Sequence, residues 1–212
     1  MKKLGLFGGT FNPIHLGHLR AAEEVKEAFE LDKILFIPSY TPPHKEKDSV
    51  APALHRLEMV RRSIRQCPGL AVSDFEALRE KPSYTFDTLL HFQNLYPNME
   101  RFFILGIDAF LEIHTWWRFP QHFSHAHFIV ISRPGGGAET LQAYIPSRLA
   151  SVLSPQGDHW TTQDGFCLFY FTCSGLDISG SQIRQAVRNG KSIRFLVPNN
   201  VRNYLYSHKL YQ

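Results

Sequence analysis

Two histidines three residues apart, His15 and His18, follow a pair of glycines in the stretch GLFGGTFNPIHLGH. Such residues could bind a metal ion, act as a hydrolase pair, donate to phosphate oxygens, or belong to a simple turn. A zinc site is a poor fit, because no nearby cysteine and no glutamate of an HExxH motif completes a ligand set. The loop signatures GxxxxGK[ST] and GxGxxG do not occur here either. From these residues alone, a phosphate site and a tight turn both stay open.

The elements on either side must place these residues at one edge of a sheet. LGLFGG (4–9) predicts a short buried strand, and LGHLRAAEEVKEAFE (16–30) predicts a helix that begins near His15. Ligands of an open parallel sheet bind beyond the carboxyl ends of its strands. A helix start there offers amides and a positive dipole end, which suits a phosphate. Histidines in this place make sense as donors that stabilise the growing charge of a transition state.

Apolar strands and helices alternate along most of the chain. Further strands are expected at KILFIP (33–38), LAVSDFE (70–76), RFFILGID (101–108), AHFIVISRPGG (126–136) and GFCLFYFT (165–172). Further helices are expected at ALHRLEMVRRSIRQ (53–66), SYTFDTLLHFQNLY (83–96, with Ser83 as N-cap), SGSQIRQAVRNG (179–190) and PNNVRNYLYSH (198–208). We therefore expect an α/β fold of Rossmann-like, doubly wound type, with a mainly parallel sheet and helices on both faces.

The same pattern indicates one domain over residues 1–212. The stretch 135–165 shows the weakest pattern and is expected to be a peripheral insertion. Residues 174–212 are expected to form a C-terminal helical part.

Composition limits the classes of function. The 212 residues are 43% hydrophobic and 20% charged with a net charge of +4, which is ordinary for a globular protein and suits an anionic substrate. Lysines and arginines are dispersed, so no nucleic-acid partner is expected. Three cysteines without a CxxC pair favour a reducing compartment. The apolar start is too short for a signal peptide, and no window offers the roughly 20 apolar residues of a membrane span, so we expect a cytoplasmic protein without a membrane partner.

The stretch GGTFNPIHLGH resembles the TFxPxHxGH signature of the nucleotidyltransferase superfamily. The features that hold the fixed spacing are Gly8, Gly9, Phe11, Pro13, His15, Gly17 and His18. The superfamily's second motif is a serine-rich turn into a helix with a basic residue, and ISGSQIR (178–184) resembles it. The resemblance implies an enzyme that transfers a nucleoside monophosphate to a phosphate-bearing acceptor and releases pyrophosphate.

Stretches in the middle of the chain resemble the bacterial nicotinate-nucleotide adenylyltransferases. They are PPHK (42–45), PSYTFDT (82–88), LGID (105–108), WWRF (116–119) and SRPGG (132–136). Such an enzyme joins ATP and nicotinate mononucleotide to give nicotinate adenine dinucleotide and pyrophosphate, in NAD biosynthesis. The resemblance implies Mg²⁺ that comes with ATP and is not held by a dedicated protein site. Association into a homo-oligomer stays open.

The resemblance also implies a role for individual residues. The catalytic residues would be His18, His15 and Arg184. ATP would be bound by Gly8, Gly9, Thr10, Phe11, His15, His18, Gly106, Asp108, Ile178, Ser179, Ser181 and Arg184. Nicotinate mononucleotide would be bound by Lys45, Tyr84, Thr85, Trp116, Trp117 and Arg133, with Trp116 as the ring that stacks on the pyridine.

Three positions depart from the family's usual residues. Asn12 stands where many relatives have aspartate, Trp117 where tyrosine is frequent, and Ser181 where threonine is common. Asparagine takes the same turn conformations as aspartate, and serine keeps the hydroxyl, so we expect little change from either.

The chemistry needs no general base. A phosphate monoester with a second pKa near 6 is already ionised at pH 7, so the enzyme has to align the reactants and neutralise charge. Three alternatives stay open: an enzyme that prefers nicotinamide mononucleotide, one of phosphopantetheine type, and a non-catalytic nucleotide-binding sensor.

Overall fold

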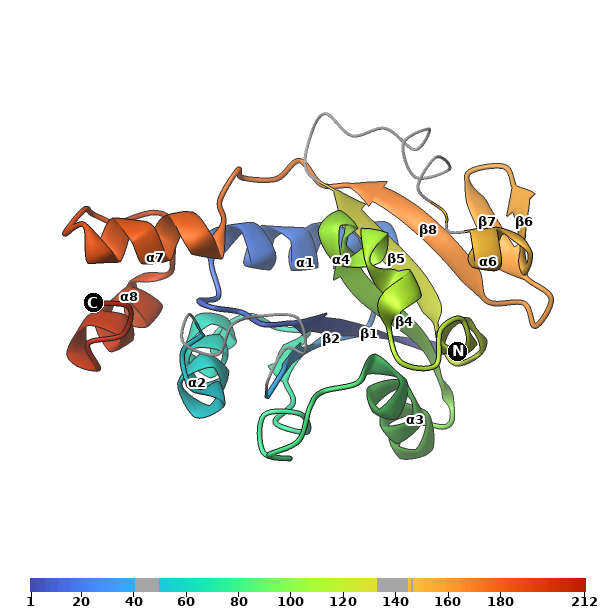
Figure 1. Cartoon of the computed structure of the whole chain (residues 1–212), viewed down its shortest axis with the longest axis horizontal. Helices are drawn as coiled ribbons and strands as arrows, with labels where there is room; N and C mark the ends of the chain where they lie inside the picture. Colours follow the sequence, from blue (N-terminus) through green and yellow to red (C-terminus); the bar gives the residue numbers. More distant parts are fainter. Residues whose placement is uncertain (41–49, 133–144, 146) are drawn as a thin grey trace.

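The structure, a computed structural model, describes residues 1–40, 50–132, 145 and 147–212. Their backbone forms an eight-stranded sheet in the order β3-β2-β1-β4-β5-β8-β7-β6 (Figure 1). The strands are β1 (Lys2–Gly9), β2 (Lys33–Pro38), β3 (Leu70–Val72), β4 (Met99–Gly106), β5 (His127–Ser132), β6 (Leu153–Gln156), β7 (His159–Thr162) and β8 (Cys167–Thr172). The helices are α1 (Leu16–Ala28), α2 (Ala53–Ile64), α3 (Thr85–Leu95), α4 (Ile107–Leu111), α6 (Ser147–Ala150), α7 (Gly180–Arg188) and α8 (Asn199–Ser207), with 3-10 turns η2 (Ile113–Thr115) and η3 (Gln121–Ser124).

The strands from β3 to β8 in the sheet order pair in parallel, and the chain changes direction across the sheet between β1 and β4. From β1 the chain first runs outward through β2 to β3, and it then returns to the other side of β1 to form β4 and β5. Adjacent strand ends at such a switch point leave a crevice for a ligand. The predicted mainly parallel, doubly wound sheet is confirmed.

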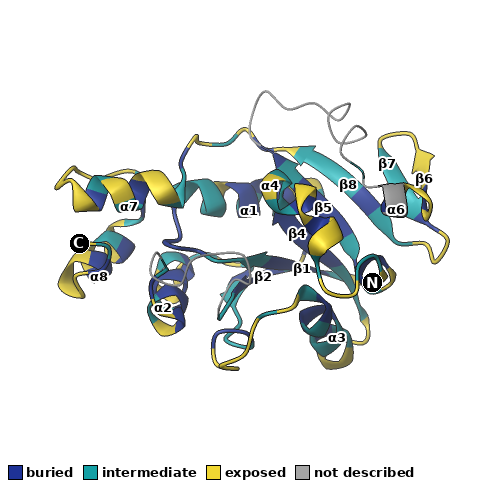
Figure 2. Cartoon of the chain, viewed as in Figure 1, coloured by how far each residue is buried: buried dark blue, intermediate teal, exposed yellow. Residues whose placement is uncertain are grey.

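Side chains of the central strands alternate between two cores, one on each face of the sheet. Leu6 belongs to the core that contains α3 residues such as Phe92, while its neighbour Phe7 belongs to the core that contains α1 residues such as Val25. The core on the α1 side also contains Val187 of α7. The central strands β1, β4 and β5 are accordingly mostly dark in the burial colouring of Figure 2, and the outer sides of the helices are exposed. Helices on both faces agree with the sequence prediction.

Three local expectations were wrong, and the first is the strand predicted over residues 70–76, which ends at Val72. Ser83 is not the N-cap of α3, because the helix begins at Thr85 after Tyr84, and the Ser83 hydroxyl instead accepts a hydrogen bond from the backbone amide of Tyr40 at 3.0 Å. The strand expected to end at Asp108 ends at Gly106, so that Asp108 lies in the first turn of α4.

The weakly patterned stretch 135–165 contributes to the sheet. Its described part contains α6, β6 and β7, and these two strands pair antiparallel with each other, while β7 continues antiparallel onto β8. Apart from Leu153, the β6 side chains are exposed, so no periodic apolar signal marked the strand. Its position at the sheet edge fits a peripheral insertion; that division, and a single domain over 1–212, stay predictions.

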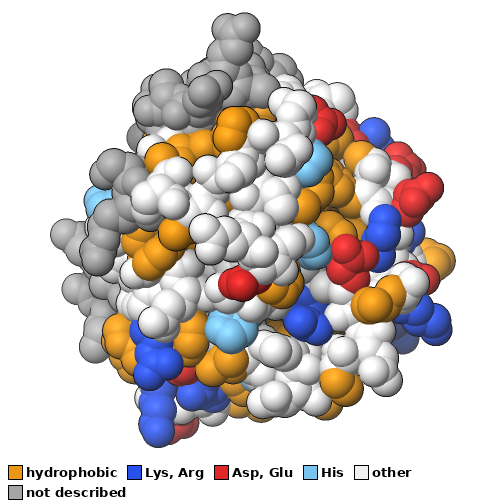
Figure 3. Space-filling view, turned by 90° about the vertical axis from the view of Figure 1, so that its right-hand side faces the viewer, with side chains coloured by type: hydrophobic (Ala, Val, Ile, Leu, Met, Phe, Trp, Pro, Cys, Tyr) orange, Lys and Arg blue, Asp and Glu red, His pale blue; other side chains and the backbone are white. Residues whose placement is uncertain are grey.

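No helix within the described ranges is long and apolar enough to cross a membrane. On the face shown in Figure 3, the basic side chains lie in separate groups among acidic and apolar ones.

Candidate active site

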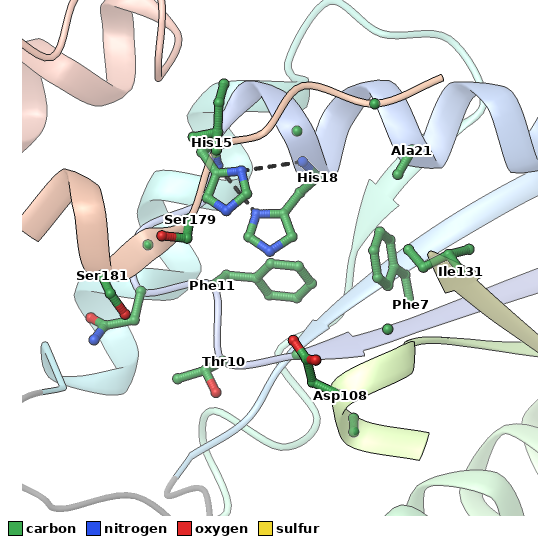
Figure 4. A pocket seen from close by; sticks show the side chains of 18 of the residues that line it. Phe7, Thr10, Phe11, His15, His18, Ala21, Asp108, Ile131, Ser179 and Ser181 are labelled. Carbon is green, nitrogen blue, oxygen red and sulfur yellow. Dashed lines mark hydrogen bonds between the residues drawn. The ribbon is translucent and has the colours of Figure 1, made fainter. Parts of the chain in front are cut away.

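A pocket of about 670 Å³ opens where β1, β4 and β5 end, which is a volume typical of small-molecule sites. Every residue that the sequence analysis assigns to ATP lines it: Gly8, Gly9, Thr10, Phe11, His15, His18, Gly106, Asp108, Ile178, Ser179, Ser181 and Arg184. Both motifs therefore meet in one cavity although they lie far apart in the sequence (Figure 4). That each of these residues binds ATP stays a prediction.

Gly8 and Gly9 make room for phenylalanine rings. A Cβ at Gly8 would lie 2.9 Å from Cζ of Phe103, and a Cβ at Gly9 would lie 3.0 Å from Cζ of Phe11. Both glycines belong to β1, and neither has a positive φ, so a tight turn is not what requires them. At Gly106, by contrast, a Cβ would meet nothing within 4 Å, which leaves open space at the end of β4.

His15 and His18 cap α1 through each other. The backbone amide of His18 donates to Nδ1 of His15, and the amide of His15 donates to Nδ1 of His18, each at 3.3 Å (Figure 4). The two rings stack with centroids 3.6 Å apart. Because each Nδ1 accepts, the proton of each neutral ring sits on Nε2. Both histidines are thus preset as Nε2–H donors on the pocket wall.

Phe11 packs against the His18 ring of the histidine pair. Its ring meets the His18 ring edge to face at 5.1 Å and the Phe7 ring at 5.7 Å. Phe11 has φ 47°, a conformation that a bulky side chain adopts only when its surroundings hold it there. The contacts of the buried Phe11 ring with Phe7 and His18 stabilise this backbone conformation.

The start of α7 forms a further part of the pocket wall, and Ser179 lies beside His15 in Figure 4. The hydroxyl of Ser179 accepts from the amide of Gln182 at 3.2 Å, as predicted for an N-cap. Arg184 donates through Nη1 to the backbone oxygen of Asn12 at 2.9 Å and through Nη2 to Oγ of Ser181 at 3.4 Å. Gly180 permits this contact between α7 and the β1–α1 loop, since a Cβ there would lie 2.8 Å from the Asn12 oxygen.

Charge in the pocket is set by one guanidinium and two carboxylates among the described residues. Burial lowers the pKa of Arg184, but the group stays a cation at neutral pH. Asp108 and Glu112 line the pocket at α4. Within the described part of the chain, no three His, Cys, Asp or Glu side chains converge as a metal site.

The segment that joins β8 to α7 is fastened to α1. Glu24, a buried residue of α1, accepts hydrogen bonds from the amide of Ser174 at 2.7 Å and from the Ser174 hydroxyl. Burial alone would raise the pKa of Glu24, but these bonds and Arg20 lower it. The adjacent Cys173 thiol has its pKa raised to about 11 by burial, so it is no nucleophile at neutral pH.

The residues assigned to nicotinate mononucleotide gather elsewhere. Tyr84 and Trp117 lie with ring centroids 5.2 Å apart, and Thr85 opens α3 beside them. Trp116 is half-buried and meets the rings of Phe103 and His122 edge to face. None of the four assigned side chains that the structure describes lines the ATP pocket. Lys45 and Arg133 lie outside the described residues.

One ring lies between the two groups of residues. Phe103 of β4 fills the space beside Gly8, since a Cβ at Gly8 would lie 2.9 Å from its ring. The Phe103 ring also contacts the Trp116 ring at a centroid distance of 6.3 Å. Trp116, one of the predicted acceptor residues, is therefore separated from Gly8 of the pocket by one side chain.

Comparison with known proteins identifies the family. A family model described as cytidylyltransferase-like matches residues 6–186. A probable nicotinate-nucleotide adenylyltransferase of Desulfatibacillum aliphaticivorans is 46% identical over 216 residues, covering 99% of both chains. A protein of the same name from Geobacter metallireducens is 40% identical over 211 residues, covering 99% of this chain and 98% of its own. The chain belongs to the nicotinate-nucleotide adenylyltransferase family. The resemblance and the enzyme class predicted from the motifs are confirmed.

Solved structures share the fold of this nicotinate-nucleotide adenylyltransferase family member. Nicotinic acid mononucleotide adenylyltransferase of Plasmodium falciparum, complexed with NaAD, superimposes with a TM-score of 0.76 at 19% identity and covers all of this chain and 98% of its own. The same protein complexed with APC gives a TM-score of 0.74.

Sequence reasoning missed the buried polar residues that hold the site of this nicotinate-nucleotide adenylyltransferase family member together. Arg56 of α2 is fully buried and donates to three backbone oxygens: those of Thr10 and Tyr40 at 2.7 Å and that of Ala51 at 2.8 Å. Burial lowers its pKa to about 10. In the sequence Arg56 is one of several arginines on a helix, and no local signal marks it. Asn12 showed only as a departure from the family pattern.

Proposed function

We propose that the chain transfers the adenylyl group of ATP to nicotinate mononucleotide, giving nicotinate adenine dinucleotide and pyrophosphate. The observation that carries the proposal is the convergence of two capped helix starts, α1 at His15 and α7 at Ser179, on one pocket. Each start directs amides and a positive dipole end toward the same space, which suits a chain of phosphates.

The proposed mechanism works by alignment and charge. The Nε2–H groups of His15 and His18 donate to oxygens of the ATP phosphates, and His18 stabilises the charge that grows as the acceptor phosphate attacks. Arg184, held between Asn12 and Ser181, neutralises the leaving pyrophosphate. The acceptor is ionised at neutral pH, so a base is not required. Asp108 lines the pocket, and its carboxylate would accept a hydrogen bond from a ribose hydroxyl of adenosine.

Magnesium enters the proposal with ATP. Mg²⁺ keeps several waters and binds phosphate oxygens, so it needs few protein ligands. Glu112, the other carboxylate among the described lining residues besides Asp108, would fit this demand through water. The ion would neutralise phosphate charge.

The acceptor preference rests on the region of Trp116 and Thr85. A pyridine ring would stack on the Trp116 indole, and the free amides at the start of α3 would donate to the ring carboxylate. Nicotinamide mononucleotide lacks that negative charge, so we propose that the acid is preferred.

A panel of acceptors tests the proposal. Pyrophosphate release from ATP and Mg²⁺ is measured with nicotinate mononucleotide, nicotinamide mononucleotide and phosphopantetheine in turn. We expect the first to give the largest kcat/KM. Turnover with nicotinate mononucleotide at background level would overturn the proposal. ATP binding without turnover on any acceptor would instead support the sensor.

Location and assembly stay predictions. The three cysteines are free, which agrees with the reducing compartment expected for a cytoplasmic protein. Sedimentation of the purified chain would show whether it forms a homo-oligomer.

A further inference from the structure

Asn12 is a junction of three segments that are far apart in the sequence. Its side-chain oxygen accepts from the amide of Ala51 at 3.0 Å and from the hydroxyl of Tyr211 at 2.6 Å. Its backbone oxygen accepts from Arg184 at 2.9 Å. The residue therefore links the β1–α1 loop (residues 10–15) to the start of α2, to α7 and to the turn that follows α8.

Tyr211 is held firmly in the orientation that this contact needs. Leu210 before it is buried in the core on the α1 side, and its amide donates to the backbone oxygen of Leu205 at 3.0 Å. Tyr211 itself has φ 66°, a region that aromatic residues rarely enter, so surrounding contacts over-determine its position. Burial raises the pKa of its phenol well above the ordinary value, and the hydroxyl stays a donor at every working pH.

The contact lies just outside the reacting centre. Asn12, Arg184 and Gly180 line the pocket, whereas Tyr211 is absent from the described lining residues. A change at Tyr211 would therefore act on the phosphate-binding residues indirectly, through its hydrogen bond to Asn12 and its electrostatic interaction with Arg184. If the Asn12 side chain loses the Tyr211 hydroxyl, the Ala51 amide still donates to it, but the peptide that carries the Arg184 acceptor is held by one hydrogen bond fewer.

We propose that Tyr211 is a positioning residue for the adenylyl transfer, which fixes Asn12 and thereby aligns the β1–α1 loop with Arg184. The inference rests on the proposed function for its kinetic part only. It predicts that the hydroxyl matters more in the transition state than in substrate binding, because Arg184 acts on the leaving group.

The test is Tyr211→Phe, which removes the hydroxyl and keeps the ring. We expect kcat to fall about 10-fold, as for loss of about one oriented hydrogen bond, with KM for nicotinate mononucleotide within about 2-fold of the parent. In an Asn12→Ala background, Tyr211→Phe should cause no further loss, because both changes remove the same contact. An unchanged kcat in Tyr211→Phe, or additive losses in the double variant, would overturn the proposal.

Tyr204→Phe is the matched control. Tyr204 is a buried tyrosine of α8 whose hydroxyl pairs with Nδ1 of His55 at 2.8 Å, away from the pocket. We expect it to lower the midpoint of thermal unfolding about as much as Tyr211→Phe and to leave kcat as in the parent. An equal loss of kcat in both variants would reduce Tyr211 to a general structural role and overturn the proposal.

Amide hydrogen exchange provides a readout that does not depend on turnover. We expect faster exchange over residues 10–18 and 180–186 in Tyr211→Phe but not in Tyr204→Phe. A parent chain without turnover would count against the proposed function, and the exchange rates would then decide the positioning role by themselves. Equal protection of both segments in the parent and Tyr211→Phe would overturn it.

Discussion

His15 and His18 each accept the other's backbone amide at Nδ1, at 3.3 Å, so that one pair of rings both caps α1 and faces the pocket. A capping box normally uses a hydroxyl and a carboxamide or carboxylate. Here both positions are imidazoles, and because each Nδ1 accepts an amide, the proton of each neutral ring lies on Nε2. The cap therefore determines that Nε2–H is the donor of each ring. The structural bond and the proposed catalytic group therefore belong to the same side chain.

Replacement of His18 separates these two roles. We expect His18→Ala to lower kcat about 100-fold, because it removes a donor to the developing charge, and to cost about 1 kcal/mol of stability through the lost cap. His18→Asn keeps a cap acceptor and should recover the stability without recovering kcat. Pyrophosphate release and urea unfolding give the two quantities. His159→Ala, in β7 and away from the pocket, is the control. Near-normal turnover in His18→Ala with normal ATP binding would refute the assigned role.

Arg184 should tolerate substitution poorly even when its charge is kept. Lysine is a point charge and cannot reach both the Asn12 oxygen and Ser181 as the planar guanidinium does. We expect Arg184→Lys to lower kcat/KM for ATP about 10-fold and Arg184→Gln about 100-fold. Arg188→Gln on the exposed side of the same helix should match the parent. Steady-state kinetics at saturating acceptor measure these values, and equal rates for the Arg184 and Arg188 variants would rule the role out.

Trp116 should affect the acceptor and not ATP. We expect Trp116→Ala to raise KM for nicotinate mononucleotide about 10-fold, from loss of a stacking surface, with KM for ATP nearly unchanged. Trp160→Ala removes another partly buried tryptophan from the same core and should leave both KM values unchanged. Initial rates at varied acceptor concentration provide the comparison. If both variants raise both KM values alike, the effect belongs to core packing.

His122 should make the fold sensitive to acid. It is buried against Trp116 and Phe86, its Nδ1 has no partner within the described residues, and burial, with a contribution from His125, lowers its pKa to about 4. In the unfolded chain the pKa of His122 is near 6.5, so its imidazole is protonated at a higher pH than in the folded chain. The free energy of unfolding is therefore unaffected by the protonation of His122 above about pH 6.5. Between about pH 6.5 and pH 4 it falls, by at most about 3 kcal/mol, because protonation favours the unfolded chain.

Urea unfolding at pH 7, 6, 5 and 4.5 checks this sign. The free energy of unfolding of the parent should fall across the series, and His122→Leu should fall less steeply. His91, His125 and His127 also have pKa values lowered by burial, and they act equally in both chains. Parallel curves would mean that His122 contributes nothing to the acid sensitivity.

Local signals predicted local structure. The helix starts near His15 and at Ser179 were predicted because apolar spacing and a cap-forming serine are signals local to each helix. The Asn12–Tyr211 contact joins residues separated by 199 positions, and no sequence period records it. Arg56 was missed for a similar reason, since a buried arginine that serves three carbonyls looks like a surface arginine until the fold brings those carbonyls together.

Gly8 was correctly identified as part of a motif, but the reason why glycine is needed there was only partly predicted. The sequence suggested that Gly8 leaves space for a ligand or a turn. In the structure, its missing side chain leaves space for Phe103, and Phe103 in turn meets Trp116.

A methyl group at residue 8 would therefore act on Phe103 and, through it, on Trp116, the residue proposed to stack on the acceptor ring. Alanine there must displace the Phe103 ring, a form of overpacking that costs about 1–3 kcal/mol, and the ring has Trp116 beside it. A substitution at residue 116 would also act on the Phe103 ring, because Trp116 contacts that ring as well. Substitutions at residues 8, 103 and 116 are therefore expected to be coupled in their effects, because all three positions meet at the Phe103 ring.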